Sequence, residues 1–149
     1  MAPTSIIVNR PFAYQKGRAM IHAIEAWFGS TPYLMWRVEN AAGTHAQQAD
    51  VSSISWTSYD ACDTPWTQKA TGTLVVADVV FDTLQTDAKW TTRSSDSLGY
   101  NLGILTTTSM FPAGDTTYVV VFSLTLTDGQ VIPIYYGQRT PKEVTAVFD

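Results

Sequence analysis

The sequence contains little of the material from which most catalytic and metal sites are built. It has one cysteine, Cys62, and two histidines. An internal disulfide is therefore excluded, and a zinc site made of cysteine and histidine is not expected. Gly-x-Ser-x-Gly, P-loop, His-Glu-x-x-His and Cys-x-x-Cys motifs are all absent from the sequence. These absences predict a protein that is not an enzyme and that uses no cofactor or metal.

Long apolar runs are also missing. No stretch approaches the ~20 apolar residues that a membrane span requires. The first residues, MAPTSIIVNRPFAY, lack the long apolar core of a signal peptide. We therefore expect a protein that is made in a cytoplasm and has no membrane partner.

Charge is scarce as well. Only 15% of the 149 residues are charged, against a usual ~25%. The net charge of −4 argues against direct binding of nucleic acid, because nucleic-acid partners are normally bound by basic surfaces. The length fits a single domain that can bury a core of its own.

What the chain does contain is a succession of short segments with alternating apolar and polar residues. Turn residues separate them, and we expect strands at 33–38, 51–59, 72–76, 79–81, 102–108 and 118–136, the last being a hairpin. Residues 19–28 fit a helix and a strand equally well, and residues 89–101 are expected to form a long loop. The pattern predicts an all-β fold, an immunoglobulin-like antiparallel β-sandwich. Residues 1–18 carry three basic residues and no acidic one, and we expect an extended N-terminal arm there, with residues 19–149 forming the sandwich.

The hairpin carries the strongest local signal. Asp128-Gly129 between two apolar segments predicts a two-residue type I′ turn. That turn pairs Leu126 with Val131 and Phe122 with Tyr135, and it places Pro133 on a strand at the sheet edge. One face of the hairpin is then a core face. The opposite face carries Val119, Val121, Ile132, Ile134 and Tyr136, and because it is half apolar we expect something to cover it.

A family resemblance begins just before this hairpin. Residues 113–120, AGDTTYVV, resemble the tyrosine corner of immunoglobulin-like domains, with Val120 at the position that is cysteine in antibodies. The wider stretch from Ala49 to Thr140 resembles the immunoglobulin-like domains of tailed-phage virion proteins, in particular those similar to the N-terminal domain of the baseplate upper protein. The residues that carry this second resemblance are QADVSSISWTSYD, VVFDTLQTDAKW, GYNL, FPAGDTTY and LTLTDGQ.

The resemblance implies a non-enzymatic virion structural protein, either a capsid decoration protein or a component of the tail, baseplate or fibre. Such a protein would be located in the virion, and its partners would be other virion subunits or copies of itself. Its mechanism would be subunit–subunit assembly. The assembly interface is then expected at residues of the arm and of the outer hairpin face: Arg10, Phe12, Tyr14, Val119, Val121, Ile132, Ile134 and Tyr136.

An alternative stays open at this point. The chain has five tryptophans, of which Trp36 and Trp56 lie on predicted strands and are expected in the core. Trp66, Trp90 and Tyr100 lie in or near predicted loops, where aromatic rings can stack on a ligand. The alternative function is therefore a carbohydrate-binding or host-receptor-binding module that uses these three aromatic side chains.

Overall fold

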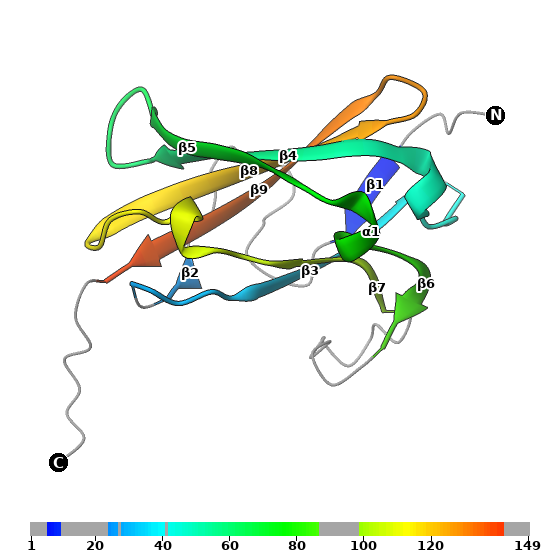
Figure 1. Cartoon of the computed structure of the whole chain (residues 1–149), viewed down its shortest axis with the longest axis horizontal. Coiled ribbons are helices and arrows are strands. Elements are labelled where there is room, and N and C mark those ends of the chain that lie inside the picture. Colours follow the sequence, from blue (N-terminus) through cyan, green and yellow to red (C-terminus); the bar gives the residue numbers. More distant parts are fainter. Residues whose placement is uncertain (1–5, 10–23, 27, 41, 87–98, 142–149) are drawn as a thin grey trace, which may run out of the picture.

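The computed structural model describes residues 6–9, 24–26, 28–40, 42–86 and 99–141. These residues form two β-sheets that pack face to face (Figure 1). The four-stranded sheet has the order β1 (Ile6–Asn9), β3 (Tyr33–Asn40), β7 (Tyr100–Leu105) and β6 (Val80–Gln85). The five-stranded sheet has the order β2 (Ile24–Glu25), β9 (Val131–Thr140), β8 (Thr116–Leu126), β4 (Val51–Asp60) and β5 (Thr67–Leu74). Three short helical turns connect strands: η1 (Gln48–Asp50), α1 (Val76–Val79) and η2 (Thr108–Met110).

The strand order is that of an immunoglobulin-type sandwich. When β3 to β9 are lettered B, C, C′, D, E, F and G, the sheets have the orders A-B-E-D and G-F-C-C′. Among the described strands, all pairs are antiparallel except the short pair of β2 with β9. The predicted all-β, immunoglobulin-like antiparallel sandwich is therefore confirmed.

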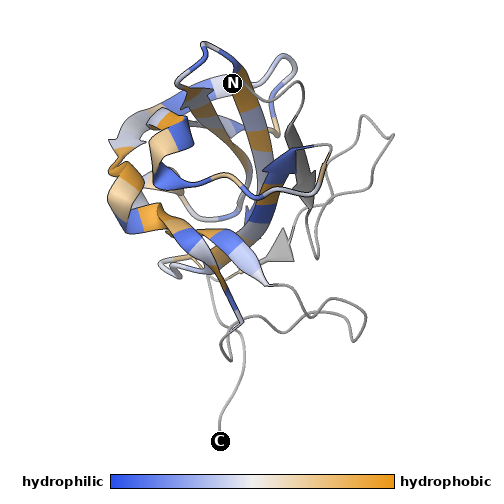
Figure 2. Cartoon of the chain, turned by 90° about the vertical axis from the view of Figure 1, so that its right-hand side faces the viewer, coloured by the Kyte–Doolittle hydropathy of each residue, from blue (hydrophilic) through white to orange (hydrophobic). Residues whose placement is uncertain are grey.

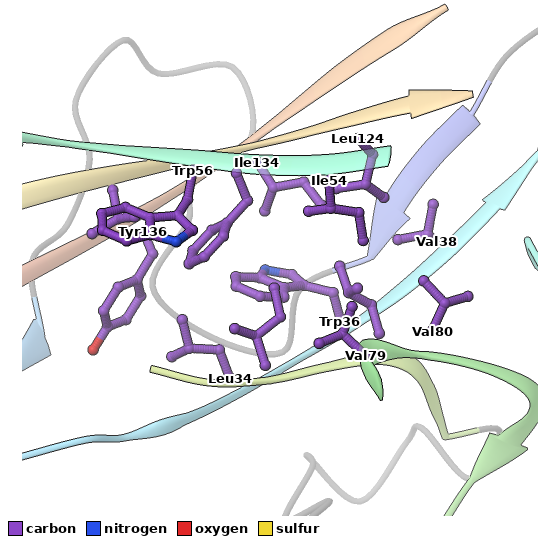
Figure 3. Packing of buried hydrophobic residues seen from close by; sticks show 14 of the residues in the cluster. Leu34, Trp36, Val38, Ile54, Trp56, Val79, Val80, Leu124, Ile134 and Tyr136 are labelled. Atoms are coloured by element: carbon purple, nitrogen blue, oxygen red, sulfur yellow. The ribbon is translucent and has the colours of Figure 1, made fainter. Parts of the chain in front are cut away.

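The core lies between the sheets because apolar residues recur at every second position of the central strands. This alternation appears as bands along the strands in Figure 2. Trp56 of β4 is only 6% exposed and occupies the place of the buried tryptophan of strand C in immunoglobulin domains. The ring of Trp36 on β3 lies 5.8 Å from that of Phe122 on β8, so an aromatic contact joins the two strands that a disulfide joins in antibodies (Figure 3 shows Trp36 and Trp56).

The tyrosine corner is present as predicted. The hydroxyl of Tyr118, near the start of β8, accepts a hydrogen bond of 2.8 Å from the backbone N–H of Ala113. Its ring packs edge-on against Phe111, with the ring centroids 6.0 Å apart. Two residues further on, Val120 is fully buried at the position that carries cysteine in antibodies. A valine therefore fills the core position of this disulfide-free sandwich.

The turn of the β8–β9 hairpin differs from its prediction by one residue. The N–H of Leu126 donates a 2.8 Å hydrogen bond to the carbonyl oxygen of Gln130, which leaves a three-residue loop, 127–129. Gly129 ends this loop with a φ of +96°, the left-handed conformation that closes three-residue hairpins. The predicted two-residue type I′ turn is therefore wrong.

This shift of one residue exchanges the two faces of β9, because neighbouring side chains on a strand point to opposite sides. Phe122 pairs with Ile134 instead of Tyr135, and Val120 pairs with Tyr136. Ile134 and Tyr136 are buried in the core (Figure 3). Ile132 packs partly against it. The outer face of β9 consequently carries Val131, Pro133 and Tyr135.

Three further predictions concern the N-terminal arm, the sheet edge at Pro133 and the loop at residues 89–101. Ile6–Asn9 pairs with β3 of the same chain, so this part of the predicted N-terminal arm belongs to the sandwich. β2 covers the edge of β9 only at Gln138 and Arg139, and Pro133 lies outside that pairing. Among the described strands, β9 is thus an edge strand along its first half only. Residues 89–98 of the predicted loop lie outside the described residues, whereas Tyr100 already begins β7.

Candidate interaction surface

Only some of the residues predicted to form the assembly interface lie on an outer face of the sandwich. Ile132, Ile134 and Tyr136 face the core, so their predicted place on an outer surface is wrong, for the reason of register given above. Val119 and Val121 do lie on the outer face of the five-stranded sheet, but Val119 is only 3% exposed and Val121 is half-buried. The three residues predicted in the arm, Arg10, Phe12 and Tyr14, lie outside the described residues.

The three aromatic residues that were predicted to bind a ligand do not form one exposed group. Trp66 is 44% exposed on the chain between β4 and β5. Tyr100 is only 1% exposed, which contradicts its prediction as a binding residue. Because it begins a strand rather than lying in a loop, its ring packs edge-on against Phe81 and Tyr33 on the outside of the four-stranded sheet. Trp90 lies outside the described residues.

Trp66 is held next to a second aromatic ring. Its ring centroid lies 6.1 Å from that of Tyr59, at an interplanar angle of 45°. Tyr59 points outward because its neighbour in β4, Ser58, is fully buried on the core side. The two rings form an aromatic pair at the end of β4.

The loop beneath this pair is closed by its own carboxylates. One Oδ of Asp60 accepts a 2.8 Å hydrogen bond from the N–H of Cys62. Asp63 accepts a 2.7 Å hydrogen bond from the hydroxyl of Thr67. These two aspartates therefore hold a turn, which is the usual role of aspartate in loops.

The outer face of the five-stranded sheet continues from the aromatic pair across β8 to β9. Tyr59 is paired with Val119, and the next outward residue of β8, Val121, is paired with Tyr135 of β9. We call Tyr59, Trp66, Val121 and Tyr135 the outer aromatic surface. In the sequence, Tyr59 alternates with the apolar Ile54 and Trp56, which is a signal for the outer face. Tyr135 was missed because the predicted hairpin register turned it inward.

Among the described residues, one hydroxyl group has a strongly raised pKa, and it lies in the core, away from this surface. Tyr136 donates a 2.7 Å hydrogen bond from its hydroxyl to the side-chain oxygen of Gln138, and both residues are buried. Burial raises the pKa of the Tyr136 hydroxyl well above its ordinary value, because the phenolate would lose its solvation. The hydroxyl therefore remains a hydrogen-bond donor and stabilises the core.

In the described part of the chain, no three His, Cys, Asp or Glu side chains lie together in a way that could hold a metal ion. Nor does any helix within the described ranges have the length and apolar character to cross a membrane.

Comparisons with known proteins add no assignment: no family model matches the chain, and neither a curated protein nor a solved structure gives a match. The fold and the outer aromatic surface are therefore the features that bear on function.

Proposed function

We propose that this chain is a non-enzymatic virion structural protein that acts by binding other subunits of a particle. It would serve as a capsid decoration protein or as a component of a tail, baseplate or fibre. The sequence resemblance to immunoglobulin-like domains of virion proteins supports the kind of particle. The observation that carries the binding role is the exposed ring of Trp66 beside Tyr59.

An exposed tryptophan is a costly surface residue unless something binds it. A tryptophan side chain can bury roughly 150–250 Å² of mostly apolar area, and burying apolar area is what drives most protein association. Tryptophan and tyrosine are also the residues most enriched at the energetic centres of protein interfaces. Trp66 retains 44% of its exposure while Tyr59 packs against its ring. It is therefore positioned to enter a pocket of a partner subunit.

The test is the substitution Trp66→Ala. We expect affinity for the neighbouring subunit to fall by at least about tenfold and incorporation into particles to fall with it, because the anchor ring is removed. Thermal unfolding should change little, since the ring contributes to a surface and not to the core. Incorporation can be measured by quantifying the protein in purified particles, and affinity by titration with the partner.

Phe28→Ala is the matched control. Phe28 is also 44% exposed, but it lies beside Pro141 at the other margin of the five-stranded sheet. The proposal requires Phe28→Ala particles to contain the protein at the wild-type level. If Trp66→Ala is also incorporated at the wild-type level, the proposed role of this surface is wrong.

A carbohydrate-binding module is the second candidate, and one observation favours it. Trp66 lies beside Asp63 and Thr67, so a stacking ring is next to polar groups. However, Tyr100 is buried and both polar groups already bond to each other. A glycan array in which wild-type protein is retained and Trp66→Ala is not would favour this candidate over subunit binding.

A further inference from the structure

The margin of the five-stranded sheet formed by β5 is open. Within the described part of the chain, β5 pairs with β4 alone, and its other side faces no strand (Figure 1). Five of its eight residues are exposed and three are half-buried. An unpaired strand edge offers a row of N–H and C=O groups to any extended chain of suitable shape.

The open groups can be assigned from the register. The hydrogen bond from Leu126 to Gln130 shows that even-numbered residues of β8 bond to β9, so odd-numbered residues bond to β4. The same alternation continued across β4 directs the backbone groups of Ala70, Gly72 and Leu74 toward β4. The N–H and C=O groups of Thr71 and Thr73 therefore point to the open side.

The edge is blocked at one end but not at the other. Lys69 has no counterpart on β4, because Ser58 pairs with Ala70 and Tyr59 pairs with Gln68. Such a bulge with a lysine is a common device that prevents strand addition. Residues 70–74 have neither a charge, a proline nor a bulge. This second part of the edge is left available.

The edge strand of the other sheet is protected in a different way. The carbonyl oxygen of Val80 in β6 accepts a 2.9 Å hydrogen bond from the side-chain amide of Gln48. The carbonyl oxygen of Asp82 lies 2.7 Å from Nε2 of His45. Side chains of the connection between β3 and β4 thus occupy backbone groups of β6, while no side chain in the described residues does so at Thr71 or Thr73 of β5.

We propose that β5 pairs with β5 of a second copy of this chain, antiparallel and symmetric about Gly72. This inference deepens the proposed assembly function, on which it rests, by naming one partner. In this register Thr71 lies opposite Thr73 of the second copy, and each such pair exchanges two backbone hydrogen bonds. Threonine pairs across strands are favourable, and on the inner side Ala70 meets Leu74 of the second copy, a small residue against a large one.

Charge complementarity supports the second copy as the partner. In the proposed register, Lys69 lies opposite Val75 of the second copy, next to that copy's α1. The charged residue of α1 is Asp78, which is exposed like Lys69. The one cation of each strand is therefore placed near an anion of the other chain, and the two lysines lie at opposite ends of the pair. No like charges face each other along residues 70–74.

The first experiment measures self-association by sedimentation equilibrium of the full chain. The wild-type protein should form a dimer. Thr73→Pro removes an outward N–H without removing a bond to β4, and it should raise the dimer dissociation constant at least about tenfold. Thr73→Val keeps the backbone donor and the branched shape, so it should dimerise like the wild type. A wild-type protein that is a monomer at all concentrations, or a Thr73→Val variant that is as weak as Thr73→Pro, would overturn the proposal.

A second experiment tests the register without the risk that proline disturbs folding. In a Cys62→Ser background, chains with Thr71→Cys are mixed with chains with Thr73→Cys and oxidised. The opposed Cα atoms of a hydrogen-bonded pair are ~5.5 Å apart, which suits a disulfide. The mixture should give a disulfide-linked heterodimer, and neither variant alone should link efficiently. Equal linking by one variant alone would contradict the register.

The outcomes separate this inference from the proposed function. Thr73→Pro reports on a dimer in solution, whereas Trp66→Ala reports on incorporation into particles. A wild-type monomer whose incorporation still depends on Trp66 would remove the dimer and leave the virion role in place. A dimer that depends on Thr73 but enters no particle would support the dimer and contradict the virion role.

Discussion

Tyr118 stabilises the sandwich through both ends of its side chain. Its ring fills the core against Phe111, and its hydroxyl accepts the backbone N–H of Ala113 in the connection that leads into β8. The second contact is partly buried, and a hydrogen bond of this kind contributes on the order of 1 kcal/mol to the stability of the fold. The hydroxyl oxygen of Tyr118 thus stabilises the connection between β7 and β8, which leads from one sheet to the other.

Tyr118→Phe tests this contact, because it removes only the hydroxyl oxygen. We expect the free energy of unfolding to fall by about 1–2 kcal/mol, as measured by urea denaturation. Tyr135→Phe is the control, since Tyr135 is half-buried on the outer face and its hydroxyl has no hydrogen-bond partner among the described residues. Equal losses for the two variants would mean that the corner contributes no special stability.

At the scale of the element, one turn residue of the β8–β9 hairpin determines which side chains of β9 face the core. The three-residue loop needs Gly129 in the left-handed region, and this choice turns Tyr136 inward and Tyr135 outward. An added Cβ at Gly129 would meet no atom within 4 Å. Any cost of substitution there is therefore due to backbone conformation and not to crowding.

Gly129→Val should lower the free energy of unfolding by at least about 1–2 kcal/mol, because a branched side chain disfavours positive φ. Gly129→Asn is the control, since asparagine enters the left-handed region more easily and should cost less. Thermal and urea unfolding of the two variants provide the measurement. Equal stability of the valine and asparagine variants would contradict the left-handed assignment.

The hairpin also shows which features could be predicted from the sequence. The strands of β4 and β8 were predicted correctly because only one of their faces is consistently apolar. In β9 the alternate sets Val131, Pro133, Tyr135 and Ile132, Ile134, Tyr136 are both apolar, so periodicity cannot choose between them. The turn alone had to decide, and Thr-Asp-Gly-Gln fits loops of two and of three residues.

The candidate surface could be predicted only in part, for similar reasons. Trp66 lies after a segment rich in turn residues, and the structure does expose it. Tyr100 follows a glycine and was assigned to a loop, but tertiary pairing begins β7 there and buries the ring against Phe81. The open edge of β5 has no sequence signal, because which strand lies at a margin is a property of the assembled sheet.

At the scale of the whole molecule, β1 has a protective role. It pairs along the end of β3, whose residues 34–38 are all buried. Without β1, residues 37–40 of β3 would present an unpaired backbone edge. Strand edges of this kind promote aggregation.

Deletion of residues 1–9 should therefore lower the melting temperature and cause association that increases with concentration, as measured by calorimetry and light scattering. Deletion of residues 1–5 leaves β1 in place and serves as the control. If both truncated proteins melt and scatter like the full chain, β1 adds nothing to the stability of the sandwich.

Gly72 links the open edge to the core in a way that limits how the edge can change. An added Cβ at Gly72 would lie 2.7 Å from the indole ring of Trp56, so the ring already occupies the space of a side chain. The residue at position 72 is thus dictated by the tryptophan on the neighbouring strand and not by its own backbone angles. Any side chain at position 72, the centre of this edge, would first require a smaller residue at position 56.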